Sequence, residues 1–351
     1  MSTVSSKHTD PDALSARPSS FWQDRRVRRF RRNRLAVFGF ITVVFFLLIA
    51  VFAPLLAPPP AVGNNCLRDL GGSSSTEVYN PTSAVFWKAM FFPPASCYLT
   101  ARVNFSQQPT PPLASVQSDA GELRPIMGTS SGYDIWYGLI WGTRTALLLA
   151  VSVVFAQLLI GIALGGISGY YGGWVDNLIQ RIIDVIFAFP SLVLVIVFTT
   201  LLGKSLPNVI IAFVMVGWAG YARIVRAEVL KVRSLEFVDG ARALGASDLR
   251  IIFRHVLPNA LTALLAIVVL DLGSVPLSAA ALSFLGIGLP PGYADWGQII
   301  NSARAWLQGP PGQPWAYWYV SFFPAFTIIL FGLGWNLLGD ALRDALDPRN
   351  Q

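Results

Sequence analysis

The sequence predicts an all-α polytopic membrane protein with six transmembrane helices. Of its 351 residues, 54% are hydrophobic and only 13% are charged, whereas a soluble domain carries about 25% charged residues. Its mean hydropathy is +0.54, and the apolar residues gather in six long stretches. Too few ions remain to cover a soluble globule, and the hydrophobicity is too high for a disordered chain. The bilayer is therefore the predicted solvent.

Residues 1–34 form a basic N-terminal tail that we expect in the cytoplasm. They carry nine Lys or Arg residues and three Asp residues, which accounts for six of the seven net positive charges. Seven arginines lie within 21–34, directly before the first apolar stretch. Such a run typically holds its end of a membrane helix inside the cell, on anionic headgroups. A nucleic-acid patch is the alternative, but we expect no nucleic-acid partner because the charge is local.

The stretch 35–57 is the first predicted membrane helix. As a helix, its 23 apolar residues extend about 34 Å, enough for a hydrocarbon core of about 30 Å. The apolar region of a cleavable signal peptide has only about 7–15 residues, so we expect a retained helix. Pro54 and 58–60, all proline, end it because proline lacks the amide hydrogen of a helix interior.

Residues 58–132 break the apolar pattern with Pro, Ser, Gly, Asn and scattered charges. With the N-terminus inside, this segment is expected outside, as a long loop or a small cap between the first two membrane helices. Both cysteines, Cys66 and Cys97, fall in it. A disulfide in an oxidising compartment and two unpaired thiols are both compatible with the sequence.

Five further hydrophobic stretches follow, within a predicted five-helix core over 133–341. They cover 143–168, 182–203, 206–224, 259–288 and 317–338. Six spans put both termini, including a tail over 342–351, in the cytoplasm. The connection 225–258 then lies inside, where the stretch from Arg223 to Arg254 carries seven basic and four acidic residues. The outer connection 289–316 has only Asp295 and Arg304, so the Lys/Arg bias agrees with this topology.

Small residues and proline predict how two of these helices behave. Glycine recurs every four residues in the second span, at Gly161, Gly165, Gly169 and Gly173. This spacing favours a close helix–helix seam, although glycine is also common in membrane helices generally. In the stretch 259–288, Gly273 and Pro276 predict a kink or break near the middle.

The chain offers little chemistry of its own. Its two Cys and two His residues are too few for a Cys/His metal framework, and we predict no metal, no bound cofactor and no catalytic residue. Gly203-Lys204-Ser205 lacks the glycine that a phosphate-binding loop needs five positions earlier, where Phe198 stands. If ATP drives this protein, another chain must bind it.

Two aspartates lie inside predicted spans, where charge is costly and often functional. Asp184 follows Arg181 by three residues, a spacing that allows a local ion pair on one helix. Asp271 lies near the middle of its span with no cation close in sequence. It is a candidate for the translocation path, facing water, a partner subunit or a substrate amine.

The connection 225–258 predicts two short helices with a glycine joint. Ser234 is a good N-cap, Glu236 suits the first turn, and Gly245 is a natural stop. Apolar residues recur every three positions, at Leu235, Val238, Ala241 and Leu244. Ser247 can cap the second helix, which is expected to end at Leu257-Pro258. The first helix is too short to be stable in water, so its stripe must pack against the membrane, the protein itself or a partner groove.

From Glu236 to Asn259 this connection resembles the EAA loop of ABC-importer permeases. The family pattern is Glu-Ala-Ala, three residues, Gly, nine residues, then Ile-x-Leu-Pro. Asp239-Gly240-Ala241 occupies the first triplet, Gly245 has the right spacing, and Leu257-Pro258 closes the motif. Gly240 stands where the family has Ala, and His255 where it has Ile.

Other stretches resemble the C-type permease subunit of dipeptide, oligopeptide and nickel importers. They are 128–134, 282–286 with the following Pro290-Pro291 and Trp296-Gly297, and 338–349. Ser130, Tyr133 and Ala279 depart from the family's residues. The resemblance covers most of 21–349 but leaves out the 58–127 loop.

The resemblance implies a permease subunit of an ATP-driven importer in the bacterial or archaeal cytoplasmic (inner) membrane. It implies four kinds of partner: a similar B-type permease, two cytosolic ATPase subunits that bind ATP and magnesium, an external substrate-binding protein, and membrane lipid. A coupling helix would dock on one ATPase through Glu236, Val238, Asp239, Gly240, Ala241, Arg242, Leu244, Gly245 and Ala246. Asp239 and Arg242 are expected at the rim of that contact, and Val238, Ala241 and Leu244 inside it. Peptides are the family's commonest cargo, but nickel, sugars and other small solutes occur among relatives, so the resemblance implies a path for peptides or similar small solutes.

Two other classes of function compete with this interpretation. A stand-alone secondary carrier would work without ATPase subunits and would typically carry more titratable groups in the membrane. A membrane enzyme would need an active site in the external segment, but 58–132 has no His and no recognisable nucleophile arrangement.

Overall fold

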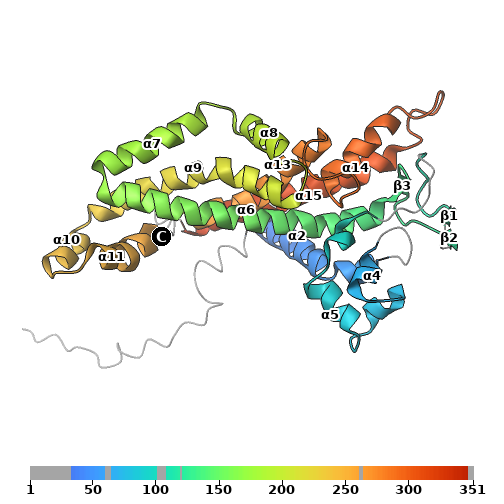
Figure 1. Ribbon diagram of the computed structural model, residues 1–351, viewed down its shortest axis with the longest axis horizontal. Helices are drawn as coiled ribbons and strands as arrows, with labels where there is room; N and C mark the ends of the chain where they lie inside the picture. The colour runs from blue at the N-terminus through green and yellow to red at the C-terminus, as the bar shows by residue number, and fades with distance from the viewer. Residues whose placement is uncertain (1–32, 60–64, 101–107, 119–120, 261–263, 347–351) are drawn as a thin grey trace, which may run out of the picture.

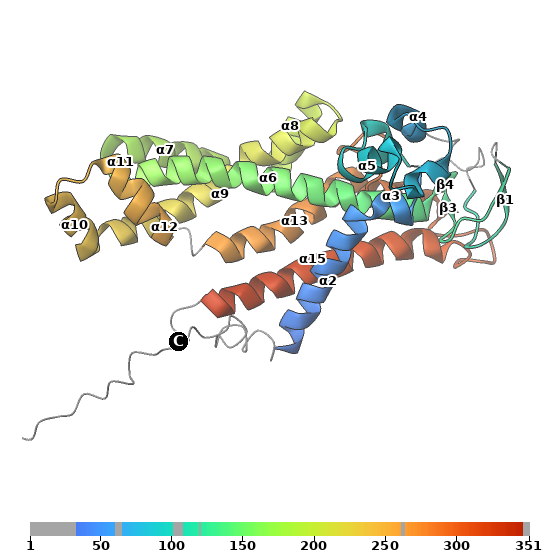
Figure 2. The same ribbon diagram turned by 90° about the horizontal axis from the view of Figure 1, so that it is seen from below.

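The computed structural model describes residues 33–59, 65–100, 108–118, 121–260 and 264–346. Of the two predicted tails, residues 1–32 and 347–351 lie outside the described residues. Figures 1 and 2 show an elongated helical molecule arranged along one long helix, α6 (Ile135–Tyr171).

Five described helices are long and apolar enough to cross a membrane individually. They are α2 (Arg34–Val51), α6 (Ile135–Tyr171), α9 (Leu206–Arg233), α13 (Leu264–Phe284) and α15 (Trp318–Leu346). Asn33 caps α2 by accepting hydrogen bonds from the amides of Leu35 and Ala36. α2 ends at Val51 instead of residue 57, because Pro54 starts a separate turn, α3 (Ala53–Leu56).

The predicted continuous span 182–203 is wrong. Two helices, α7 (Gly173–Phe187) and α8 (Ser191–Leu202), meet here at an angle of 87°. Pro190 lacks an amide hydrogen and disfavours a helical backbone at Phe189, so α7 ends before it. Counted as one broken unit, the pair is a sixth candidate span among the described residues.

Two other spans also differ from their predicted form. α9 continues past residue 224 to Arg233, because hydropathy marks where the apolar segment stops, whereas Ala, Glu, Leu and Lys beyond it still favour helix. α13 runs through Gly273 and Pro276 as one helix, so the predicted break is absent. Gly273 instead gives Trp335 of α15 room to pack, since an added Cβ there would collide with it.

Glycines of α6 let α9 approach closely. An added Cβ at Gly169 would lie 2.9 Å from the Cβ of Val229, and those at Gly161 and Gly165 would overlap α9. Three of the four predicted glycines therefore form the seam. The prediction is wrong for Gly173, which starts α7 with φ +60° and has no neighbour within 4 Å of its Cβ position.

The two ends of α6 carry different structures (Figure 1). At one end lie α10 (Glu236–Ala243), α11 (Asp248–Ile251), the π-helix η5 (Ile252–Val256) and α12 (Leu257–Ala260). At the other end lie the helices α4 (Cys66–Leu70), η3 (Ser75–Tyr79), α5 (Ala84–Phe91), η4 (Ala95–Tyr98), α14 (Trp296–Ala303) and η7 (Arg304–Trp306). Two small antiparallel hairpins lie at this same end (Figure 1). One pairs β1 (Val116–Ser118) with β2 (Gly121–Leu123), and the other pairs β3 (Thr129–Ser130) with β4 (Tyr133–Asp134).

The length of α6 separates these two ends. Its 37 residues span about 55 Å, well beyond a bilayer core of about 30 Å. A membrane crossed by α6 therefore leaves α10 on one side and the α4–α5 region on the other. The described part of 65–100 is a folded cap of short helices (hereafter the cap), not an open loop.

Candidate functional site

Polar contacts tie the segment after α9 to the end of α6. Arg233, the last residue of α9, donates a guanidinium hydrogen bond to the carbonyl of Tyr170, where a cation complements the negative end of a helix. The Tyr170 hydroxyl donates to the Asp248 carboxylate at 2.6 Å, at the start of α11. None of these three residues belongs to the predicted coupling set. Their only signal in the sequence is the charge of Arg233 and Asp248 beside helix ends.

α10 begins at Glu236, with Leu235 as its N-cap. The predicted cap Ser234 is wrong, because α9 uses that residue as its own C-cap. The Ser234 hydroxyl donates to the Lys231 carbonyl at 2.9 Å. The two helices therefore follow one another with almost no loop between them.

The polar face of α10 is exposed. Glu236 and Asp239 stand in its first turn and Arg242 in its last, where their charges complement the helix dipole. Arg242 lies 3.1 Å from Asp239, in a pair whose side chains are half exposed or more. Such a pair contributes little to stability. A hydrogen bond with the Tyr170 hydroxyl raises the pKa of Arg242.

Gly245 ends α10 in the left-handed region, with φ +80°. The amide of Ala246 donates to the Ala241 carbonyl at 3.1 Å, and that of Gly245 donates to the Arg242 carbonyl at 3.0 Å. This is the Schellman pattern of a helix end. No atom lies within 4 Å of a Cβ built on Gly245, so its backbone conformation, and not lack of space, requires glycine.

The apolar residues of α10 do not share one face. Val238 is fully buried in the chain's own core, and Ala241 and Ala246 pack at the edge of that core. Leu244 is 91% exposed. The predicted partner contact is therefore wrong for Val238, because residues six apart on a helix lie about 120° from each other. Phe237, which the predicted set omits, is 46% exposed.

The chain after Gly245 packs as part of the membrane core. The predicted end of the second helix at Leu257-Pro258 is wrong, because α12 continues to Ala260 and tolerates Pro258 in its first turn. Ile251 and Val256 are fully buried in the same cluster as Val238 and residues of α6 and α9. The whole segment is thus attached to the membrane helices by its own side chains.

A second candidate site is a cavity of about 240 Å³ between α6, α8, α9 and α13. Its polar lining comprises Gln157, Ser191, Asp271, Ser274 and Ser278. Asp271 accepts hydrogen bonds from the hydroxyls of Tyr221, at 2.6 Å, and Ser274, at 3.1 Å. Within the described residues, no group of three or more His, Cys, Asp or Glu side chains could hold a metal ion.

Asp271 differs from two other carboxylates of the helical bundle. Asp184 pairs with Arg223 of α9 at 2.9 Å. The predicted pair with Arg181 is wrong, because α9 packs beside α7 and presents a cation there. Asp176 of α7 likewise accepts two hydrogen bonds from Arg226, each 2.6 Å long. No ion pair with Asp271 is found in the described part of the chain.

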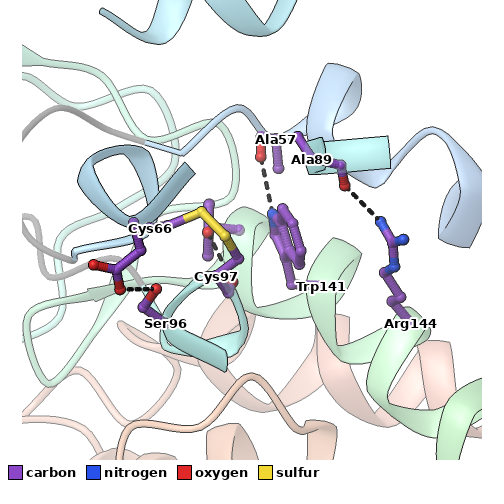
Figure 3. Close-up of a disulfide and its surroundings, with 9 residues drawn as sticks. Ala57, Cys66, Ala89, Ser96, Cys97, Trp141 and Arg144 are labelled. Atoms are coloured by element: carbon purple, nitrogen blue, oxygen red, sulfur yellow. Dashed lines mark hydrogen bonds between the residues drawn. A yellow bond between two sulfur atoms is a disulfide. The ribbon is translucent and has the colours of Figure 1, made fainter. Parts of the chain in front are cut away.

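The cap at the other end is closed by a disulfide between Cys66 and Cys97 (Figure 3). Both cysteines are fully buried, in a core that also contains Trp141 of α6. The Trp141 indole donates a hydrogen bond of 2.9 Å to the carbonyl of Ala57, the C-cap of α3, and the Arg144 guanidinium donates one of 3.2 Å to the carbonyl of Ala89 in α5. The cap therefore sits firmly on α6.

Comparison with known families gives two matches. Residues 161–351 match the family "Binding-protein-dependent transport system inner membrane component". Residues 20–67 match the "N-terminal TM domain of oligopeptide transport permease C". Together they cover both the first membrane helix and the region from the glycine seam to the C-terminus.

Individual relatives agree with these matches. The dipeptide transport system permease protein DppC of Alkalihalophilus pseudofirmus is 35% identical over 92% of this chain and 88% of its own length. The oligopeptide transport system permease protein OppC of Bacillus subtilis is 32% identical over 97% of this chain and 93% of its own length. A chain of the MetNI methionine ABC transporter has a TM-score of 0.48 at 18% identity, over 60% of this chain and 97% of its own.

The fold is that of a multi-pass membrane protein, and its relatives are transport permeases. The chain belongs to the family of binding-protein-dependent transport system inner membrane components, as a permease subunit of an ABC importer. The resemblance drawn from the EAA-type spacing and the C-type motifs is confirmed. Family membership favours an importer subunit over a stand-alone carrier.

Proposed function

We propose that α10 is the coupling helix that receives ATP-driven movement from a cytosolic ATPase subunit. One observation carries this proposal. α10 presents exposed apolar side chains, Phe237 and Leu244, while Val238 anchors the same helix in the core of the membrane helices. A push on the exposed face would therefore displace α6 and α9 as one body.

The contact surface of α10 combines apolar and charged groups. Leu235 and Phe237 are each nearly half exposed and Leu244 almost fully. Glu236, Asp239, Gly240, Arg242 and Gly245 are exposed as well, and Ala241 and Ala246 are partly so. This patch suits a short helix seated in a groove, with apolar anchors and a charged rim.

The proposed topology has six spans, with α7 and α8 counted as one, and both termini in the cytoplasm. It places α10 in the cytoplasm and the cap outside. The basic excess between Arg223 and Arg254 supports this orientation. The disulfide at the opposite end of α6 supports it independently, because disulfides persist in oxidising compartments.

The proposed assembly pairs this chain with a homologous B-type permease, two ATPase subunits carrying ATP and magnesium, and an external substrate-binding protein. The chain itself would perform no covalent chemistry and bind no nucleotide. The family description as an inner membrane component of a binding-protein-dependent system supports this division of labour. It also supports a bacterial or archaeal inner-membrane location.

We propose short peptides as the cargo. Relatives that cover most of this chain are named for dipeptide, oligopeptide and glutathione transport. These cargoes share an extended backbone of amide groups and charged ends. The cavity beside Asp271 would form part of their translocation path.

Site-directed crosslinking tests the coupling helix. Both cysteines of the sequence are joined in the disulfide, so Leu244→Cys would introduce the chain's one free thiol. In the assembled complex, a short bifunctional reagent should link this thiol to an ATPase subunit, identified by mass spectrometry. Phe92→Cys, at a cap residue that is 83% exposed, is the matched control and should give no such product.

The crosslink also has an outcome that would refute the proposal. If Leu244→Cys labels only lipid-soluble or external partners, while Phe92→Cys links to an ATPase, then α10 is not the coupling helix and the proposed topology is inverted. Repeating the reaction with ATP and vanadate should change the yield at position 244, because a lever must move with the ATPase cycle.

A further inference from the structure

The cavity between α6, α8, α9 and α13 contains a fixed carboxylate with an unused capacity to bind a cation. Each Asp271 oxygen accepts one hydroxyl hydrogen bond, from Tyr221 or from Ser274. A carboxylate oxygen has two lone pairs, so each retains one acceptor position. The two hydroxyls therefore orient the carboxylate without neutralising it.

The surroundings do not supply the missing positive charge. Asp176 and Asp184 have their arginines within 3 Å, whereas no Lys or Arg of the described residues pairs with Asp271. Carboxylates inside membrane segments almost always face a partner charge or a water-filled path. Asp271 lies on the cavity wall together with Ser274 and Ser278, so the cavity is where a cation would meet it.

We propose that this cavity is a subsite for the α-ammonium group of a transported peptide, a proposal that rests on the peptide-importer function above. An ammonium has three donors and no acceptor, which matches the acceptor positions left on Asp271. The Ser278 hydroxyl donates to the Ser274 carbonyl and the Gln157 amide donates to the Phe213 carbonyl. The Ser278 oxygen therefore keeps its acceptor capacity and Gln157 keeps a second amide hydrogen, on the cavity wall that the first peptide bond would meet.

The dimensions of the cavity fit one end of a peptide. Its volume of about 240 Å³ is below the range of about 300–1,000 Å³ that holds a drug-sized ligand. The apolar part of the wall, formed by Leu192, Val195, Phe213 and Val275, would accept the first side chain without selecting its charge. The subsite would therefore read the N-terminus and tolerate many sequences.

Uptake by the reconstituted complex tests the subsite. The assay uses proteoliposomes with both permeases, the ATPases, ATP and the binding protein, and a peptide pair, free and N-acetylated, that the binding protein loads equally. The wild-type complex should take up the free peptide at least tenfold faster. Asp271→Asn should abolish this preference by slowing only the free peptide, and Asp271→Glu should keep most of it.

A matched control distinguishes the loss of the Asp271 subsite from the general effect of removing a carboxylate from the helical bundle. Asp184→Asn removes a carboxylate of α7 whose pair with Arg223 is largely exposed, and it should leave the preference unchanged. If Asp271→Asn leaves both uptake rates at the wild-type level, or lowers both equally, the ammonium subsite is refuted. If the wild-type complex shows no ATP-dependent uptake of any peptide, the proposed peptide cargo is refuted.

A second measurement keeps Asp271 intact, so it tests the proposal even if the Asp271→Asn complex fails to assemble. In a Ser278→Cys complex, a positively charged methanethiosulfonate should modify position 278 at least tenfold faster than a negatively charged one. Free peptide at saturating concentration should protect the thiol, and the N-acetylated peptide should not. Equal rates for the two reagents, or protection by both peptides, would overturn the proposal. Loss of assembly in Asp271→Asn together with equal rates would instead identify Asp271 as a contact to the partner permease.

Discussion

The two ends of α6 differ in how completely this chain buries its own apolar side chains. At the cap, the disulfide and the side chains of Trp141 and Arg144 complete a core from residues of this chain alone. At the α10 end, Val238 is buried but Phe237 and Leu244 remain in the open. The cap end is a closed folded unit, whereas the α10 end presents exposed apolar side chains that the proposed ATPase contact would cover.

This difference shows that a segment can carry a strong family motif without forming a complete core, and can form a complete core without a motif. On the proposed coupling role, the α10 segment carries a family spacing because a groove on the ATPase would fix its length, its glycine stop and its charges. The cap has no such motif, since its residues need only to satisfy one another. A substitution at α10 should therefore act on coupling, whereas a substitution at the cap should act on local stability.

Gly245→Pro should give the largest effect, a loss of peptide uptake by more than a hundredfold. Proline fixes φ near −65°, whereas Gly245 has φ +80°, so the Schellman end of α10 cannot form. Ala241→Glu should act similarly, because it places a carboxylate against the apolar core. Uptake and peptide-stimulated ATPase activity of the reconstituted complex measure the effect.

Gly240→Ala is the control for this prediction. Gly240 lies inside α10, has open space at its Cβ position and no positive φ. Alanine should therefore preserve coupling and favour the helix by about 0.5–1 kcal/mol. Normal uptake by Gly245→Pro, with normal membrane insertion in all variants, would contradict the coupling role.

Replacing both Cys66 and Cys97 with serine should break the cap and leave α10 untouched. The bridge closes a segment with a sequence separation of 31, for which loop entropy predicts a local loss of about 3–4 kcal/mol. Protease cleavage within 66–97 should become at least a hundredfold faster. Basal ATPase activity should stay within twofold of wild type. A parallel loss of basal ATPase activity would show that the two ends are not independent.

Asp295 should give the cap side of the molecule a pH dependence. This N-cap of α14 is buried, which raises the pKa of its carboxyl to about 6. The folded state therefore holds the proton more tightly than the unfolded state does. The free energy of unfolding should be greatest below about pH 4 and should fall by up to about 3 kcal/mol as the pH rises to about 6. Above that pH it should stay level.

Asp295→Asn isolates this effect, because asparagine is an equally good N-cap but does not titrate. Thermal unfolding of the complex in detergent, followed by tryptophan fluorescence between pH 4 and 8, should lose its downward slope in the variant. An unchanged slope would assign the pH dependence to another group.

Tyr170→Phe should give the smallest effect, at the α10 end. It removes the 2.6 Å hydrogen bond to Asp248, a loss of about 1 kcal/mol, and should reduce ATPase stimulation by peptide up to about fivefold at that energy. Tyr171→Phe, at the neighbouring residue that is 52% exposed, should change nothing. Equal effects of both variants would remove the Tyr170–Asp248 contact from the coupling path.

Hydropathy located most of the membrane helices because each apolar stretch must satisfy its own backbone in lipid. It failed where the chain leaves lipid or meets proline. α9 continues past residue 224 to Arg233, and Pro190 splits the stretch 182–203 into α7 and α8. Hydropathy predicts neither the extension of α9 nor the bend between α7 and α8, because it records composition and not the direction of the backbone.

The sequence predicted where the candidate site lies, but not which of its side chains are buried and which are exposed. The spacing around Gly245 indicated a helix, a left-handed stop and a second helical segment, all of which depend on local backbone preferences. It could not indicate that Val238 turns inward while Leu244 turns outward. That choice depends on where α6 and α9 stand, which is a property of the packed chain.

By itself, the sequence determined the membrane class, most of the span positions, a glycine seam on the second span and the family, because these depend on composition and on residues close together in the chain. Only the tertiary structure decided that Arg223, and not Arg181, neutralises Asp184, and that Asp271 has hydroxyl neighbours but no cationic partner among the described residues. The physical reason is that a charge buried among helices chooses its partner through space. Arg223 lies 39 residues from Asp184 and Tyr221 lies 50 residues from Asp271, beyond the reach of any local pattern.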